Sequence, residues 1–538
     1  MEAGLILLAL LATLGRIWAL IGLSILTGWA LAFFAVRSRA FETAYVPIVS
    51  ALESIPVIAF LPIVLVVFVS HIGGAWGTEI AVDFLVFDAV SWNIWIGAYQ
   101  SFKTIPENLG EVAENYSLGT WQTFWSLFVP HSIPRITSNL FSSFADALFY
   151  ITVSEVFTIG IHSYSAFGIG TLIVQFTLAG ATSDLAFALA VVGIAVAAIT
   201  LLLSSFSRRA VARYGLDTRG DITSRPGPTS PRSRWVRALG GPRRRIAQHL
   251  ARSAEARDRQ GGVPPPSTAR TVGKWAVYTA LLALGALLAY GAAQVVTGQP
   301  IAVWASLLRQ TPYLLLAMGA DYLRVAAVSF TALGVAITLG YFLATHRRTN
   351  VVVAPIVQVI AAYPVPTYFP LVFAATVGVF SAVIPFAYVE LYIFLIAFLS
   401  CFYYVFFDFW VGVLAIPSEF WEVMDNHELG FVTRMRRVIL PATFPYLITG
   451  MSSTINSCWA GLAIGEFWPN IARDRSLISG LGMMKFIGSN LAVGNVAAAA
   501  WVSLLFAVVV VIYGILFTRN LMDLARQRYV IEEGVYAA

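Results

Sequence analysis

Apolar stretches of about 20 residues recur along the chain, and this feature constrains the fold more than any other. Examples are Ile17–Val36, Leu185–Leu203, Lys274–Val296 and Val496–Phe517. A helix of about 20 residues crosses the roughly 30 Å hydrocarbon core of a bilayer. Only 12% of the residues are charged, against about 25% in soluble proteins. The sequence therefore predicts an all-α integral membrane protein.

The chain contains one unit twice, because ten pairs of marker residues recur at nearly constant spacing. Four residues recur 308 positions later: Arg16, Pro47, Pro56 and Pro62 match Arg324, Pro355, Pro364 and Pro370. Six recur 311 positions later: Pro106, Glu111, Gly119, Pro130, Pro134 and Glu155 match Pro417, Glu422, Gly430, Pro441, Pro445 and Glu466. Such internal repeats are common in membrane transporters.

The apolar stretches predict about 11 transmembrane helices. The first unit, residues 1–207, has five, at 13–35, 48–70, 80–100, 136–160 and 185–207. The second unit, residues 274–538, has the same five at 321–343, 353–377, 383–411, 447–467 and 496–518, and one in front at 274–297. Residues 301–316 could form a short interfacial helix. Residues 208–273 form a linker rich in Arg, Pro, Gly and Ser, a composition typical of flexible segments.

Positive charge predicts the orientation in the membrane. Residues 208–274 carry 16 Lys or Arg against four acidic residues, and basic segments beside spans mark the cytoplasmic side. Eleven spans then place the N-terminus outside and the C-terminus in the cytoplasm, and the two units enter the membrane in the same orientation. Nucleic-acid binding is not indicated, since no binding fold accompanies the basic segment.

Each unit contains a long polar loop on the predicted cytoplasmic side. The first polar loop, Gln100–Arg135, contains Glu-Val-Ala-Glu-Asn-Tyr-Ser-Leu-Gly at 111–119. The second, Val411–Tyr446, contains Glu-Val-Met-Asp-Asn-His-Glu-Leu-Gly at 422–430. Connections between helices are usually short, so a long loop kept in both copies indicates a function. The pattern predicts a short helix presented to a soluble partner.

These loops resemble the coupling loop of permeases in binding-protein-dependent ABC importers. That motif has Glu-Ala-Ala, a Gly six residues after the Glu, and a final Pro 19 residues after it. Glu111 and Pro130, and likewise Glu422 and Pro441, are 19 residues apart. The Gly comes later here, at Gly119 and Gly430, and Ser117 and Glu428 occupy the family's Gly position. The residues that the resemblance assigns to ATPase coupling are Glu111, Ala113, Gly119, Pro130, Glu422, Gly430 and Pro441.

Other segments are similar to the nitrate, sulfonate, taurine and bicarbonate branch of this family. They are the proline-spaced stretches at 53–62 and 362–370, and Ser154-Glu155 and Gly465-Glu466 with the later Phe167–Gly170 and Ser479–Gly482. The resemblance implies a methionine-permease-like, type I importer fold and transport of a small anion. It also implies a single-chain pseudo-dimer with two ATPase subunits, an extracytoplasmic binding protein and surrounding lipid. ATP and Mg²⁺ would bind to the ATPases, and no cofactor or metal is expected in this chain.

Glu155 and Glu466 are candidate gate or pathway residues near the outer ends of apolar helices. Ionisable groups at such positions are costly and are usually paired or functional. The alternative is a hydrogen-bonded lock between helices. The prolines Pro56, Pro62, Pro364 and Pro370 free backbone carbonyls that can line a substrate cavity, although simple bending for packing explains them equally well.

Arg16, Arg324, Arg473 and Arg475 are predicted at the outer face. They either reach the headgroups or attract anions to the outer mouth, and Arg473 and Arg475 could also dock the binding protein. Cys401 and Cys458 are expected in the core. The sequence lacks a Gly-x4-Gly-Lys-Ser/Thr loop, so no ATP site is expected, and no catalytic signature stands out. An ion-coupled secondary transporter with parallel repeats is the alternative function, and a channel is a third.

The topology is testable by cysteine labelling. We expect residues 208–273 and both polar loops to be cytoplasmic, because the basic residues gather on that side. A membrane-impermeant thiol reagent added to sealed cells should leave single cysteines in all three segments unlabelled. Labelling of any one of them from outside would contradict the orientation.

Overall fold

The structure is a computed structural model. It describes residues 2–53, 55, 57–70, 72–116, 118–159, 162–214, 279, 285–287, 289–472, 475–514, 516 and 520–521. The described residues of both repeat units belong to one compact unit. Most of the predicted linker, together with Pro56, Ser117 and Arg473, lies outside the described residues.

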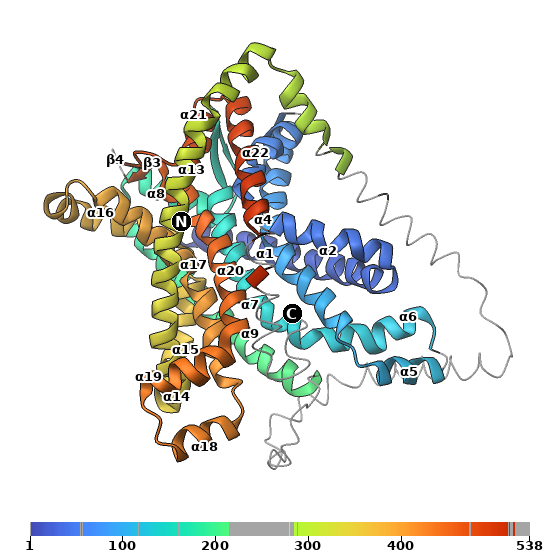
Figure 1. Ribbon diagram of the computed structural model, residues 1–538. Coiled ribbons are helices and arrows are strands. Elements are labelled where there is room, and N and C mark those ends of the chain that lie inside the picture. The colour runs from blue at the N-terminus through green and yellow to red at the C-terminus, as the bar shows by residue number, and fades with distance from the viewer. Residues whose placement is uncertain are drawn as a thin grey trace. The chain divides into compact units, whose positions relative to one another are not determined.

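The first unit is a series of helices with one β-hairpin (Figure 1). Its long helices are α1 (Glu2–Arg37), α4 (Gly74–Lys103), α7 (Val129–Ser154) and α9 (Thr182–Tyr214). Its shorter elements are α2 (Arg39–Glu53), η1 (Val57–Phe60), α3 (Leu61–Val64), η2 (Leu65–Ser70), α5 (Glu107–Asn115), α6 (Thr120–Thr123), η3 (Phe124–Phe128), β1 (Val156–Ile159), β2 (His162–Ser165) and α8 (Ile169–Ala179).

The second unit repeats this order. Its long helices are α13 (Ile301–Val335), α16 (Val365–Val383), α17 (Tyr388–Leu414), α20 (Leu440–Gly465) and α22 (Val496–Tyr513). Its shorter elements are η4 (Ala336–Gly340), α14 (Tyr341–Thr345), α15 (Arg347–Ala362), α18 (Ser418–Asn426), α19 (Phe431–Arg434), η5 (Met435–Ile439), β3 (Phe467–Ala472), β4 (Arg475–Ile478) and α21 (Met483–Ala492). The fold is thus an all-helical membrane fold built from two repeats, with a small antiparallel hairpin in each.

Within the described residues, eight helices are long and apolar enough to cross a membrane. Four expected spans differ. Residues 353–377 are divided between α15 and α16, because the chain is extended at Tyr363 before Pro364. Residues 48–70 form several short segments, because prolines interrupt the helical hydrogen bonds there. Residues 136–160 lie largely on α7, which is more polar because it contains His131, Arg135 and Asp146. The expected span at 274–297 falls partly outside the described residues. Residues 301–316 are no separate interfacial helix, since they begin the continuous helix α13.

Helix α20 packs closely on α17 because three glycines face that helix. A Cβ on Gly461 would lie 2.5 Å from the Ala397 Cα, and one on Gly450 would lie 2.7 Å from the Val405 Cα. Gly465 approaches the backbone of Ile393 in the same way. Small residues allow such close approach and favour packing between membrane helices. Cys401 and Cys458 are buried free thiols on these two helices, as expected of core residues.

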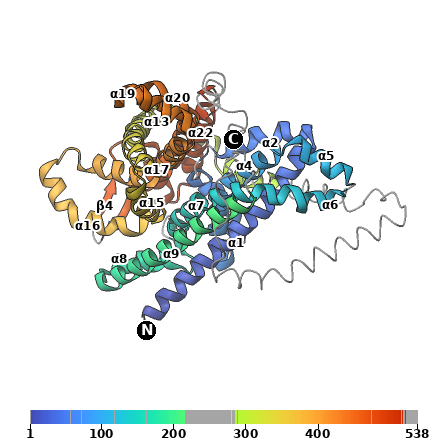
Figure 2. The ribbon, with the colours of Figure 1, turned by 90° about the horizontal axis from the view of Figure 1, so that it is seen from below.

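The proline-broken segment of each unit packs against the other unit. In the first unit η1 and α3 contact α22, and η1 also contacts α20. In the second unit α15 contacts α7 and α9, and Figure 2 shows α15 beside these helices. The buried cluster around Val57, Val64 and Phe68 accordingly includes Trp459 and Phe506 of the second unit. The two units therefore share core residues across the repeat.

Candidate coupling loops and polar clusters

The two polar loops have matching backbones although their sequences differ. Helices α5 and α18 each have nine residues and are followed by a turn and a second short helix. The Leu118 N–H donates to the Ala113 carbonyl at 3.0 Å, and the Leu429 N–H donates to the Met424 carbonyl at 3.0 Å. Gly119 has φ −63° and ψ 157°, and Gly430 has φ −64° and ψ 157°. The described parts of the two turns therefore share one backbone hydrogen bond and one glycine conformation.

The loops expose the residues that the sequence singled out. Glu111 and Glu422 are exposed, whereas Ala113 is buried against the body of its unit. Pro130 and Pro441 lie at the start of α7 and α20, directly after the π-helical turns η3 (Phe124–Phe128) and η5 (Met435–Ile439), so each turn accommodates a residue that donates no backbone hydrogen bond. In the second unit α18 and α19 lie at the opposite end from β3, β4 and α21 (Figure 1).

Large apolar side chains are exposed on both loops. In the first they are Val112, Tyr116, Trp121 and Trp125, and in the second Phe420, Val423, Phe431 and Val432. Exposed apolar groups gathered in this way mark a surface that contacts another protein or the membrane. Arg434 braces the second loop through the Leu429 carbonyl at 2.5 Å and the Asp425 carboxylate at 2.7 Å. The corresponding residue of the first loop is Thr123, so the first loop lacks this arginine.

Glu428 explains part of the departure from the family motif. It has φ 47°, the left-handed conformation, which is rare outside glycine. Glu428 occupies the position at which the family motif has its glycine. The second loop thus adopts the left-handed conformation without the glycine that most easily adopts it.

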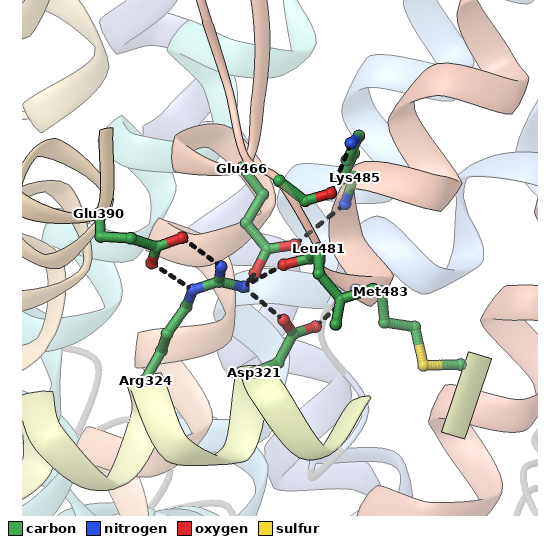
Figure 3. A network of polar contacts seen from close by, with 8 residues as sticks. Asp321, Arg324, Glu390, Glu466, Leu481, Met483 and Lys485 are labelled. Atoms are coloured by element: carbon green, nitrogen blue, oxygen red, sulfur yellow. Dashed lines mark hydrogen bonds and ion pairs between the residues drawn. The ribbon is translucent and has the colours of Figure 1, made fainter. Parts of the chain in front are cut away.

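A buried arginine cluster ties together the second unit (Figure 3). Arg324 on α13 binds Glu390 on α17 through two hydrogen bonds of 2.6 and 2.8 Å. The same guanidinium lies 2.9 Å from Asp321 and 3.0 Å from Glu466, and it donates to the Leu481 carbonyl at 2.7 Å. Asp321 and Glu466 are fully buried.

Backbone donors complete this second arginine cluster. The Met483 N–H donates to Asp321 at 2.7 Å, and the Lys485 N–H donates to Glu466 at 3.1 Å. Since buried carboxylates are stable only when paired and hydrogen-bonded, these contacts fix the start of α21 to α13 and α20. The cluster therefore connects four elements of the second unit.

The first unit has a corresponding cluster in which a threonine replaces the aspartate. Arg16 on α1 binds Glu79, lies 3.1 Å from Asp83, and reaches only to 4.0 Å from Glu155. The Thr13 hydroxyl, at the position of Asp321, donates to Glu155 at 2.7 Å and accepts from the Ile169 N–H. The Gly170 N–H donates to Glu155 at 2.6 Å. This first arginine cluster likewise ties α1, α4 and α7 to the start of α8.

The surroundings of Arg16 and Arg324 differ from those expected under either interpretation of the sequence. Arg16 and Arg324 neither reach freely toward headgroups nor stand as unpaired cations, because each lies among three carboxylates. Their side chains are only 16% and 14% exposed. Arg475 on β4 is exposed. Glu155 and Glu466 make the contacts of an interhelical tie, and the gate role remains a prediction.

Of the described pathway prolines, Pro364 lies at a break between two helices, whereas Pro62 and Pro370 lie within helical segments. Pro62 is buried in α3, Pro364 separates α15 from α16, and Pro370 is buried in α16. Tyr363, before Pro364, has ψ 117°, as expected for a residue that precedes proline. Its hydroxyl donates to the Leu189 carbonyl of α9 at 2.7 Å. The break thus gives the second unit a direct hydrogen bond to the first.

Comparison with protein families assigns the two repeats. Residues 24–215 and 336–530 both match the family described as binding-protein-dependent transport system inner membrane component. The two segments cover more than two thirds of the chain. The chain belongs to this family. A search of curated proteins finds no matching relative.

The protein is therefore a multi-pass inner-membrane permease subunit of an ABC importer. Permeases of this family work with ATPase and binding-protein partners, so the expected role is transport rather than catalysis. Membership also decides against the ion-coupled secondary transporter and the channel. The match does not extend to a substrate.

Several members of the permease's clusters were not found from its sequence. Thr13 and Asp321 were missed because these equivalent positions hold different residues in the two units. Glu79 and Asp83 were missed because no residue of their apolar stretch was among the pairs that recur in the second unit. A usable signal was the three-residue spacing from Thr13 to Arg16 and from Asp321 to Arg324, which places each pair on one helix face.

The permease's glycines next to Glu155 and Glu466 provide a test of the clusters. A Cβ on Gly482 would lie 2.0 Å from the Glu466 Oε2, whereas one on Gly480 would meet nothing within 4 Å. We expect Gly482→Ala to displace the buried carboxylate and to destabilise the protein by about 3 kcal/mol. Gly480→Ala should leave the melting temperature of the purified protein nearly unchanged. Equal melting temperatures for the two variants would contradict the role of the cluster.

Proposed function

We propose that this permease forms the complete membrane pathway of an importer as a single-chain pseudo-dimer. The observation that carries the proposal is the pair of polar loops with one backbone structure, one in each repeat. The two-segment family match is consistent with it. Each loop, with its exposed apolar side chains, would bind one of two ATPase subunits, which would hold ATP and Mg²⁺.

The proposed orientation places both polar loops, the linker and the C-terminus in the cytoplasm, with the N-terminus outside. The hairpins and arginine clusters would then face the extracytoplasmic binding protein. Support comes from the distribution of basic residues in the sequence. Arg475, exposed on β4, would be available to that partner.

The coupling role of the loops is testable with matched glutamate variants. We expect Glu111→Gln and Glu422→Gln to lower uptake at least about tenfold while ATP hydrolysis continues, because a lost contact with the ATPase of about 1.4 kcal/mol is a factor of ten. The control is Glu419→Gln, which changes the same charge on the exposed surface of α18.

The measurements are the mass of the purified complex, its ATPase rate and its transport rate. One permease chain with two ATPases, and uncoupling by Glu111→Gln and Glu422→Gln but not by Glu419→Gln, would support the proposal. Two permease chains per complex, or full coupling after both glutamates are replaced, would contradict it.

The substrate class we propose is a small anion such as nitrate, bicarbonate or a sulfonate. It is supported by the sequence resemblance of the proline-spaced segments and of the Phe167–Gly170 and Ser479–Gly482 motifs. Anion attraction by Arg16 and Arg324 does not contribute, since carboxylates surround both.

Uptake of labelled nitrate, bicarbonate and taurine by vesicles that contain the whole importer tests this class. We expect ATP-dependent uptake of at least one of the three, with competition among anions of similar size. Uptake restricted to cationic or uncharged solutes would contradict the anion proposal and leave the pseudo-dimer unaffected.

A further inference from the structure

A chain of four polar side chains crosses from one repeat to the other near the middle of the long helices. Asp146 on α7 accepts a hydrogen bond from Asn93 on α4 at 3.2 Å. It also accepts one from the Tyr404 hydroxyl, on α17 of the second unit, at 2.5 Å. Ser457 on α20 lies near the Tyr404 hydroxyl. The bond between Asp146 and Tyr404 therefore joins the two units.

These four residues are two pairs of equivalent positions. Asn93 and Tyr404 are 311 residues apart, and so are Asp146 and Ser457, the spacing that relates the two repeats in this region. Equivalent residues of two related halves come close to one another only near the axis that relates those halves. In the proposed orientation the repeats run parallel, and that axis is then along the membrane normal. The chain of side chains therefore lies at or near this axis.

Tyr404 lies well inside the candidate membrane span Tyr388–Leu414, so the crossing is expected within the membrane. Asp146 lies eight residues before the end of α7, about 12 Å at helical rise, and Tyr404 lies ten residues before the end of α17, about 15 Å. Asp146 and Tyr404 are only half-buried, as are Asn93 and Ser457. Phe144 and Phe406, on the same two helices, are by contrast fully buried.

Below the crossing the same two helices meet through aromatic rings. Phe141 on α7 and Phe407 on α17 have ring centroids 5.7 Å apart, edge to face. Phe141 lies five residues before Asp146, toward the polar loop, and Phe407 lies three residues after Tyr404. Near the axis the two units are thus in contact at two depths, through aromatic rings at one and through a polar hydrogen bond at the other.

We propose that the Asp146–Tyr404 hydrogen bond, flanked by Asn93 and Ser457, is a gate in the translocation pathway that opens during each transport cycle. The proposal rests on the proposed pseudo-dimer, in which the pathway runs between the two units. A carboxylate in the middle of a membrane is costly and marks a functional site unless it is fully paired within a core. Here its partner belongs to the other unit, so separating the units breaks the bond.

The chain offers a matched control on the same helix. Tyr392 on α17 is fully buried, and its hydroxyl lies 2.7 Å from the Thr376 hydroxyl on α16. This hydrogen bond stays within the second unit. Tyr404→Phe and Tyr392→Phe remove the same hydroxyl from the same helix, but only the first removes a bond between the units.

Thiol labelling at Ser457 reads the gate directly. Ser457→Cys is introduced after Cys401 and Cys458, both buried, are replaced by alanine. If that background fails to assemble, the buried native cysteines are retained. The probe is (2-sulfonatoethyl) methanethiosulfonate, added to vesicles that contain the permease with its ATPase, with and without ATP. Labelling requires neither the substrate nor a known number of ATPases, so failure of the anion or stoichiometry proposal leaves this test valid.

We expect slow labelling without ATP and faster labelling during turnover. Tyr404→Phe should raise the rate without ATP about tenfold, because a hydrogen bond to a charged group holds the gate closed. Asp146→Asn, which keeps the acceptor oxygen but removes the charge, should give a smaller rise, and Tyr392→Phe should give none. Equal rates for Tyr404→Phe and Tyr392→Phe, or no labelling of Ser457→Cys in any state, would overturn the proposal.

Discussion

The need to satisfy two buried carboxylates, Glu155 and Glu466, determines how each unit is held together. A carboxylate without water must be paired and hydrogen-bonded. Each unit supplies an arginine and a backbone N–H from the first turn of a later helix, and the first unit adds the Thr13 hydroxyl. Satisfying one side chain therefore positions the first helix of the unit, the helix after the polar loop and the segment after the hairpin. The glycines beside the carboxylates follow from the same requirement, because only a missing side chain leaves room for them.

The features found from the sequence alone depend on local pattern or on repetition. Apolar length predicts α1, α4 and α9, and recurrence in both units singled out Glu155, Glu466, Arg16 and Arg324 as separate candidates, without indicating that the arginines and glutamates meet. Contacts between residues distant in the chain left no such signal. The packing of η1 and α3 on the opposite unit, the two hairpins and the pairing of Arg16 with Glu79 each depend on tertiary structure, which overrides local preference.

The polar loops show which part of a motif is structural. Their shared backbone tolerates Ala113 in one copy and Met424 in the other, both buried, and tolerates a left-handed Glu428 where glycine would be unstrained. The second loop has Arg434 as an additional brace. Backbone geometry is thus the common property, and the side chains provide each copy with its own contacts. Two loops that present one shape with different residues can bind identical partners with different strength.

Fusion of the two units into one chain permits an interface that two identical subunits could not form. In the first unit Gly97 on α4 faces Asn139 on α7. The equivalent residues of the second unit are Asp408 on α17 and Gly450 on α20, so the glycine lies on the other helix of the pair. Near the axis the equivalent positions have likewise diverged, to Asn93 and Tyr404 and to Asp146 and Ser457. In a homodimer a tyrosine at one position and an aspartate at the other would occur twice, placing two carboxylates close to the axis, where like charges repel. A single carboxylate bound by a single tyrosine avoids this cost, which is a physical reason for the two repeats to diverge at the crossing.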